Sequence, residues 1–310
     1  MGSRVDWPDG KVFAFTVFDD TDLATLENIV PVYALLEECG LRTTKSVWPL
    51  SGSQESTWCG TTCEDSEYRN WLLQVRDHGF EIGYHMATHH SSVREQSIRG
   101  LDRFAEIFSD FPKVMANHSA CRENIYWGDS RLTGLHASIY NLLTRYRFKG
   151  RYRGHLDGDK FFWGDVCKER VKYVRGFVFP EINTLKACPI MPYHDPQRPY
   201  VNYWYASSEG SEVKSFSRCI SEENQDRLEQ EGGACIMYTH FAVGFVEHGQ
   251  IDSRFSSLIK RLSRKNGWFV PVSTLLDYLL DTNGRHVITD RERKRLERRW
   301  LWHKLRVGTT

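Results

Sequence analysis

The sequence has no long apolar run and no excess of charge of either sign. No apolar segment approaches the roughly 20 residues that a membrane-spanning helix needs, and positions 1–8 lack the apolar region of a signal peptide. The formal net charge is +1, from 41 Lys and Arg against 40 Asp and Glu, which excludes a generally basic nucleic-acid binder. We therefore expect a cytoplasmic protein, with association at a membrane surface left open.

The cysteines also lack a metal-binding pattern. Of the eight, only Cys59 and Cys63 lie close together, and a zinc ribbon would need a second pair at similar spacing. Reduced thiols are the expected state in a cytoplasmic enzyme. An exposed disulfide between Cys59 and Cys63 is the alternative that the spacing leaves open.

Apolar segments alternate with segments of helical periodicity along most of the chain. With 310 residues, 40% of them hydrophobic, the chain can bury a full core. The predicted strands are 12–18, 42–48, 81–84, 113–116 and 234–238, and the predicted helices are 23–39, 65–78, 92–108 and 132–146. This alternation is typical of a parallel sheet or barrel, in which catalytic groups gather at the C-terminal ends of the strands.

Titratable residues follow three of these strands directly. Asp19 and Asp20 end the first apolar run, and two buried carboxylates there require a cation or a partner. His85 and His89 follow the strand 81–84, at a spacing that brings two imidazoles together on a helical turn. His240 follows the strand 234–238. Acting together at one barrel edge, these residues could form a metal-dependent hydrolytic site.

These segments resemble the polysaccharide deacetylases of carbohydrate esterase family 4. That family has an Asp-Asp pair after its first strand, then Gly-His-Glu-Ile-Gly-x-His-(Ser/Thr)-x-x-His, and a late catalytic His. The matching segments here are 18–20, 79–89 and 239–240, in the same order. The resemblance spans roughly residues 12–280. It implies an irregular (β/α) barrel of about seven parallel strands.

The resemblance also implies a role for each residue. Asp20, His85 and His89 would bind one divalent transition metal, with Zn²⁺ expected, Asp19 would be the general base and His240 the general acid. The order of the two carboxylates follows the resemblance alone. Four further residues are candidates for substrate binding or for orienting the base: His118, Arg122, Trp163 and Arg175.

The chain departs from the family pattern in two places. Met86 stands where the family has Ser or Thr, and His90 where Pro or Ser is common. The Arg-x-Pro-Tyr segment that shapes the family's acetate pocket is absent, and residues 116–124 occupy its place in the order. The expected function is removal of N- or O-linked acetyl groups from a sugar or glycan intermediate, without nucleic acid as a partner.

Two other classes of function remain open. Asp20 and Asp22 also match the Asp-x-Asp pattern of haloacid-dehalogenase-type phosphatases, in which Asp20 would be the nucleophile, Asp22 the acid and base, and Mg²⁺ the cofactor. That class needs a later Lys and an acidic pair after a strand, whereas the strand 234–238 ends in Thr-His. The third class is an inactive glycan-binding protein on the deacetylase fold.

Two regions outside these motifs carry expectations of their own. The aromatic-rich segments 161–165 and 200–205 are equally consistent with a glycan-binding wall and with core packing. Residues 291–306 carry a net charge of +6, and a capping-box spacing predicts that a helix begins near 289–292. We divide the chain into a catalytic domain, 1–285, and a basic C-terminal helix or tail, 286–310. The tail is expected to pack on the domain, and contact of 289–306 with a membrane or protein is the alternative.

Overall fold

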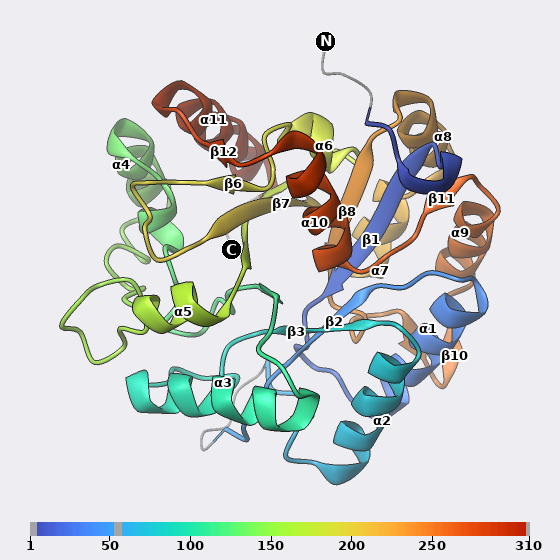
Figure 1. Ribbon diagram of the computed structural model, residues 1–310, viewed down its shortest axis with the longest axis horizontal. Coiled ribbons are helices and arrows are strands. Elements are labelled where there is room, and N and C mark those ends of the chain that lie inside the picture. The colour runs from blue at the N-terminus through green and yellow to red at the C-terminus, as the bar shows by residue number, and fades with distance from the viewer. Residues whose placement is uncertain (1–4, 53–57, 308–310) are drawn as a thin grey trace.

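Seven parallel strands close into a barrel (Figure 1). The computed structural model describes residues 5–52 and 58–307. Each strand pairs with the next around the ring, and β8 returns to pair with β1, which confirms the predicted barrel. In ring order the strands are β1 (Phe13–Asp19), β2 (Thr44–Val47), β3 (Glu81–Tyr84), β4 (Val114–Met115), β5 (Tyr173–Phe179), β7 (Tyr203–Glu209) and β8 (Ala234–Thr239).

Short strands extend the sheet outside the ring. β11 (Gly267–Trp268) pairs with the start of β1, and β6 (Tyr193–His194) runs antiparallel to β7. β12 (His286–Val287) pairs with β6. A separate hairpin consists of β9 (Val246–Glu247) and β10 (Gln250–Ile251).

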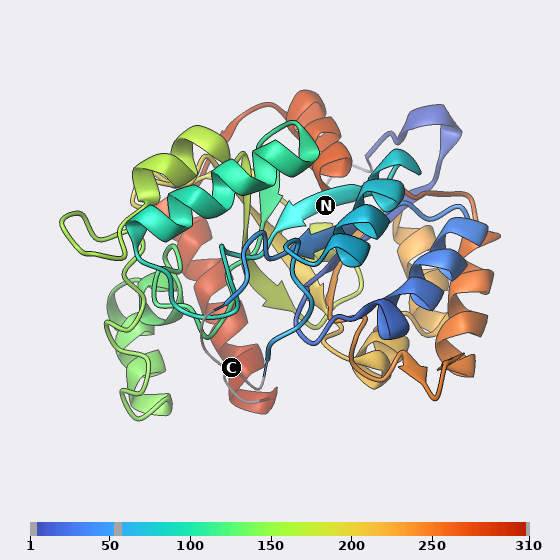
Figure 2. The same ribbon diagram turned by 90° about the horizontal axis from the view of Figure 1, so that it is seen from below.

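Helices cover the outside of the barrel (Figures 1 and 2). They begin where the sequence supplies caps: the Asp65 carboxylate accepts a hydrogen bond from the Tyr68 amide, and Thr25 forms a capping box with Asn28. The α-helices are α1 (Leu26–Glu38), α2 (Ser66–Asp77), α3 (Arg94–Phe108), α4 (Gly134–Leu143), α5 (Gly164–Arg170), α6 (Thr184–Ala187), α7 (Val213–Cys219), α8 (Glu222–Glu231), α9 (Ser253–Ser263), α10 (Val272–Asn283) and α11 (Asp290–Val307). Two 3₁₀ turns complete the set, η1 (Pro8–Gly10) and η2 (Gly128–Arg131).

The aromatic-rich segments belong largely to the core. Trp163 and Tyr205 are fully buried, and Trp204 is 4% exposed. The Trp163 indole N–H donates to the Glu123 carbonyl, which satisfies its polar atom inside the protein. Core packing is thus the role of these three side chains, whereas Phe162 and Tyr200 of the same segments are only partly buried, with ring centroids 5.2 Å apart.

The basic C-terminal segment forms α11, which packs against α4 and β5. The predicted capping box forms, because the Thr289 hydroxyl accepts from the Glu292 amide and the Glu292 carboxylate accepts from Thr289. Trp300 is buried, and the fully buried Glu297 accepts hydrogen bonds from the Thr133 hydroxyl. Residues 290–306 are thus packed on the barrel, which is the arrangement expected from the sequence. Within 5–52 and 58–307, every helix is too short or too polar to cross a membrane.

The cysteines are free thiols in this structure. Cys63 is buried and Cys59 is exposed, and neither is in a disulfide. Burial raises the pKa of the Cys63 thiol to about 12, so this group is neutral at ordinary pH. The expected reduced state is therefore the one that the structure contains.

Candidate active site at the C-terminal edge of the barrel

Three carboxylates follow one another at the end of β1 and point to different partners. Asp19 is the last residue of β1, and Asp20 and Asp22 lie in the turn that follows. All three are at least 95% buried. Because successive residues of an extended chain face opposite sides, Asp20 projects away from the partners of Asp19.

Asp22 lies between two imidazoles. Its Oδ2 is 3.0 Å from His85 Nε2, and its Oδ1 is 2.8 Å from His118 Nε2. One ligand atom from each of the three residues lies within 4.8 Å of the others, so the three could hold a metal ion. Asp22 Oδ2 and His118 Nε2 are buried atoms without a hydrogen-bond partner in the described part of the chain. A buried carboxylate oxygen and a buried imidazole nitrogen left without a hydrogen bond are ligand atoms that a cation could satisfy.

The opposite nitrogen of His85 fixes which atom faces the site. His85 Nδ1 lies 3.1 Å from the Ala116 carbonyl oxygen, which can only accept a hydrogen bond. Nδ1 therefore donates to that carbonyl, and Nε2 points at Asp22 as the nitrogen that could serve as a metal ligand. Burial raises the pKa of Asp22, but the neighbouring His118 and His85 outweigh it and hold that pKa well below its usual range.

The two groups of candidate ligands share Asp22, and each contains one residue of the predicted set, His85 in the first and Asp20 in the second. Residues 87–90 form bends rather than a helical turn, and Met86 has a φ of 71°, so the helical i, i+4 relation does not apply to His85 and His89. The His89 ring lies beside His90 and packs on Gly52, where a Cβ would meet the imidazole. Among the described residues, His89 belongs to neither group of three candidate ligands.

His118 takes the place that the sequence reserved for His89. It follows the short strand β4, and its ring centroid lies 5.2 Å from that of His85. The indole of Trp48 contacts both rings, with centroid distances of 6.1 Å to His85 and 5.4 Å to His118. The sequence identified His118 as a substrate-binding candidate at the mouth of the barrel. Its place at the mouth is as expected, and its partner is the carboxylate of Asp22.

Asp20 forms a two-point ion pair with Arg175 of β5. The two guanidinium nitrogens lie 2.8 Å and 2.5 Å from the two carboxylate oxygens. Burial lowers the pKa of Arg175, but Asp20 outweighs it and raises that pKa above its usual value, so the pair is ionised. Asp20 also belongs to a second group of candidate ligands, with Asp22 and His240. Arg175 is therefore a partner of Asp20 rather than a residue facing substrate.

Asp19 belongs to a separate network beneath the site. Its Oδ2 lies 3.0 Å from Lys45 Nζ and accepts a hydrogen bond from the Tyr33 hydroxyl. Its Oδ1 accepts from the Phe241 amide at 2.8 Å. Burial raises the pKa of this fully buried carboxylate, and Lys45 and the Phe241 amide oppose that rise only in part. These contacts tie Asp19 to the residue after His240, and its base role stays a prediction.

His240 completes the edge from the end of β8. Its Nδ1 lies 2.8 Å from the Ser211 carbonyl oxygen, so that nitrogen carries a proton. Its Nε2 faces the site, 3.7 Å from Asp22 Oδ2 and 3.5 Å from the Tyr238 hydroxyl. The side chain is 17% exposed, whereas those of His85 and Asp20 are at most 4% exposed. His240 is thus the site residue with the most access to solvent and substrate.

The remaining two candidates lie outside the site. Trp163 is a core residue, as its complete burial shows. Arg122 is exposed, with its guanidinium stacked 5.3 Å from the Phe161 ring. Neither residue takes part in the ion pairs around Asp20 and Asp22. The spacing Asp20-x-Asp22 was a further signal in the sequence. It places these two carboxylates on one side of an extended chain and could have identified Asp22 as a site residue.

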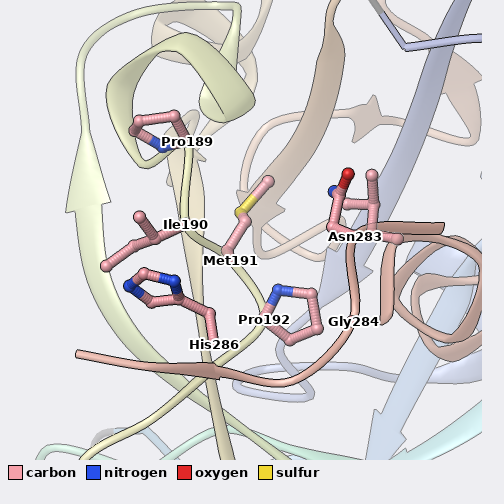
Figure 3. Close-up of a pocket in the computed structure, with 8 residues that line it drawn as sticks. Pro189, Ile190, Met191, Pro192, Asn283, Gly284 and His286 are labelled. Atoms are coloured by element: carbon pink, nitrogen blue, oxygen red, sulfur yellow. The ribbon is translucent and has the colours of Figure 1, made fainter. Parts of the chain in front are cut away.

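A cavity elsewhere in the molecule has no such chemistry. It has a volume of about 100 Å³ and lies where the chain between α6 and β6 meets the end of α10. Figure 3 shows Ile190 and His286 on one side of it and Asn283 on the other. His286 pairs with Glu292 at 3.1 Å. This cavity shares no residue with the carboxylate and imidazole cluster.

Comparison with known proteins adds a likeness of fold. No protein-family model matches the sequence, and no curated protein sequence matches it. A structure assigned as a polysaccharide deacetylase from Mycobacterium smegmatis is 12% identical, with a TM-score of 0.50, over 93% of this chain and 97% of that chain. PuuE allantoinase is 10% identical, with a TM-score of 0.49, over 89% of this chain and 93% of that one. At this identity the first likeness shows that the chain has the fold of a polysaccharide deacetylase.

Proposed function

We propose that this chain, folded as a polysaccharide deacetylase, is a metal-dependent hydrolase that removes N- or O-linked acetyl groups from a sugar or glycan intermediate. The observation that carries the proposal is the cluster at the barrel edge. Asp22, His85 and His118 bring three candidate ligand atoms together, and the pair Asp20–Arg175 and the imidazole of His240 lie beside them. This supplies a ligand set, a base and an acid at one place.

The donor set suits a divalent transition metal. Two neutral imidazoles and one carboxylate are the ligand types that Zn²⁺ prefers in catalytic sites, where a further position stays available. Asp22, His85 and His118 would hold the ion, because their ligand atoms lie within 4.8 Å of one another. When bound, the ion would supply Lewis acidity to the acetyl carbonyl and lower the pKa of a water molecule.

The surrounding residues have distinct tasks in this proposal. Asp20 accepts a proton from the attacking water, since each carboxylate oxygen keeps a lone pair beyond the one held by Arg175. Arg175 fixes the orientation of that carboxylate. His240 delivers a proton from Nε2 to the leaving nitrogen or oxygen, while Ser211 holds Nδ1. Asp20 and Asp22 thus take the roles that the sequence resemblance gave to Asp19 and Asp20.

The phosphatase alternative fits the site less well. It needs a later Lys and an acidic pair after a strand, whereas β8 is followed by His240. A glycan-binding protein without turnover differs from our proposal only in activity, so the same experiment separates them.

The test is metal analysis combined with acetate release. We expect purified protein to contain close to one equivalent of transition metal, and chelator to abolish acetate release from an acetylated sugar. His118→Ala should lose the metal, whereas the matched variant His89→Ala should retain it. If His118→Ala retained the metal and His89→Ala lost it, the ligand set predicted from the sequence would be the correct one.

The substrate panel should extend beyond extracellular polymers. The family's acetate-pocket segment is absent, and residues 116–124 bring His118 to the site instead. We propose a nucleotide-, lipid- or oligosaccharide-linked acetyl sugar, met in the cytoplasm. Acetate release should be measured across these classes, alongside a generic phosphatase substrate. Mg²⁺-dependent phosphate release without acetate would overturn the proposal in favour of a phosphatase, and absence of both would favour a binding protein.

A further inference from the structure

Helix α4 turns an apolar stripe outwards. Leu135, Ile139, Leu142 and Leu143 recur at the spacing of one helix face, which normally packs on a core. Here the same side chains are 74%, 38%, 68% and 41% exposed. The buried side of α4 instead carries Tyr140, whose ring contacts Trp300 of α11. The stripe is therefore an additional apolar surface that the fold does not use.

The chain that leaves α4 surrounds this stripe with positive charge. Between Asp129 and Asp157 the sequence has six Lys and Arg and no Asp or Glu. Arg145, Arg147 and Lys149 are exposed in the turn that follows α4, together with Tyr146. These three cations form no ion pair with a described carboxylate; Arg147 lies over the Phe148 ring and Lys149 over the Tyr146 ring. Their charge is thus available to an anionic partner.

The end of α11 brings the same kind of surface to the mouth of the barrel. Trp302 is 61% and Leu305 is 49% exposed, and Arg306 lies over the Trp302 ring. Lys304 in this last turn approaches Glu209, the final residue of β7, at 3.5 Å. Glu209 pairs with Tyr238, two residues before His240. Figures 1 and 2 both show α4 beside α11.

We propose that these residues form a docking surface for an anionic phospholipid bilayer. The docking surface consists of the apolar side chains Leu135, Ile139, Leu142, Leu143, Tyr146, Trp302 and Leu305 with the cations Arg145, Arg147 and Lys149. Apolar side chains that enter the headgroup region, flanked by cations that meet anionic lipids, are the two components of interfacial binding. Residues 130–156 contain Lys and Arg but no Asp or Glu, and this positive charge favours an anionic lipid surface over a neutral one.

Docking by this surface has a consequence for the substrate class. The last turn of α11 lies at the rim that carries His240, so the bilayer would lie next to the mouth of the barrel. An acetylated glycan attached to a membrane lipid could then reach His240 from the headgroup layer. This extension rests on the proposed function, whereas binding to the bilayer does not.

The experiment is co-sedimentation of the full chain with phosphatidylcholine vesicles, with and without phosphatidylglycerol. We expect binding to the anionic vesicles only, weakened by added salt. Leu142→Glu/Leu143→Glu should reduce the partition coefficient at least roughly tenfold, since two apolar anchors are lost. Arg145→Glu/Arg147→Glu/Lys149→Glu should reduce it by a similar factor. Both changes are at exposed positions, and circular dichroism confirms that the variants fold.

Matched controls lie elsewhere on the surface. Val287→Glu replaces a 53% exposed apolar side chain on β12, and Lys260→Glu/Arg264→Glu reverses two charges on and after α9, across the barrel from α4 (Figure 1). These variants should bind vesicles like the original chain. The proposal is overturned if the original chain does not bind anionic vesicles, or if the control variants lose binding as much as the docking-surface variants do. It is also overturned if the original chain binds no vesicles and instead forms a dimer that Leu142→Glu dissociates. Acetate release from a water-soluble sugar, measured on the same variants, reports separately on the proposed function.

Discussion

Asp19 and Asp22 are three residues apart, almost equally buried, and surrounded in opposite ways. Asp19 has a lysine ammonium, a tyrosine hydroxyl and a backbone amide around it, all of which are hydrogen-bond donors. Asp22 has two imidazole nitrogens beside it, and its Oδ2 makes no hydrogen bond within the described residues. The first carboxylate has a cationic partner within the protein. The second is a candidate ligand for a metal cation.

The difference teaches that burial of a carboxylate does not by itself identify a functional site. A buried carboxylate must be compensated, and the kind of partner decides what it can do. Lys45 compensates the charge of Asp19, because separating the ammonium group from the carboxylate would leave two buried charges unpaired. The imidazole of His85, whose Nδ1 is tied to a backbone carbonyl, directs Nε2 at the carboxylate, where it could serve as a metal ligand. The first arrangement serves the fold and the second suits a cation.

The largest effect should separate Asp20 from Asp19 in catalysis. Asp20→Asn should keep the metal and lose turnover by about 10²–10⁴-fold, the range for a missing general base. The double variant Asp19→Asn/Lys45→Met removes the other carboxylate without leaving a buried charge, and should keep turnover within about tenfold. Metal content and acetate release are measured on both proteins. Equal losses of turnover in the two would mean that Asp19 is also needed for the chemistry.

A second test breaks the Asp19 network by its cation. Lys45→Met leaves Asp19 buried without its positive partner, which should lower the free energy of unfolding by about 3–5 kcal/mol. Adding Asp19→Asn to this variant should restore most of that loss. Urea denaturation measures both changes. A single variant as stable as the original chain would show that the ion pair contributes little to the fold.

Glu123 extends the comparison to a carboxyl whose burial is not matched by a cation. It is fully buried beside Cys121 and Ser92, and burial raises its pKa to about 8. Its pKa is higher in the folded than in the unfolded chain, so the unfolded chain releases this proton first as the pH rises. Between roughly pH 4.5 and pH 8 the free energy of unfolding should therefore fall, by roughly 4 kcal/mol.

Glu123→Gln keeps the shape of the side chain and removes its titration. Its stability should change less over the same pH range than that of the original chain. Chemical denaturation at a series of pH values compares the two proteins. Parallel curves would show that Glu123 is not the group responsible.

The smallest effect concerns the geometry of Asp20. Arg175→Lys keeps the charge but loses the two-point contact, so the carboxylate is held less firmly. Turnover should fall about tenfold with metal content unchanged, and the midpoint of the acid limb of the pH–rate profile should move. A drop in thermal stability with an unchanged pH profile would point to a purely structural role.

The sequence predicted the framework of the site well. The strand predicted at 81–84 is β3 as observed, and β1 and β8 differ from their predicted ranges by one residue. Strand periodicity depends on local burial, so it can be recognised without the tertiary structure. The location of the candidate site followed from the same pattern, because the C-terminal ends of parallel strands meet at one edge of a barrel.

The assignment of individual residues required the structure. His118 rather than His89 meets Asp22 because of the backbone after β3, including the positive φ of Met86, which no local preference predicts. Arg175 was one of two arginines that the sequence could offer to a carboxylate, and it meets Asp20 across 155 residues of chain. The outward direction of the α4 stripe likewise depends on Tyr140 filling the contact with α11.

The long separation of Asp20 and Arg175 links the chemistry to the order of folding. β1 and β5 are not neighbours in the ring, so their ion pair forms only after the intervening strands are in place. Asp19 makes an even longer connection, to Phe241 at the end of β8. Such non-local contacts form late, because chain entropy opposes them until the barrel is nearly closed. A partly folded intermediate would therefore lack the site, and binding of a cation would report on barrel closure itself.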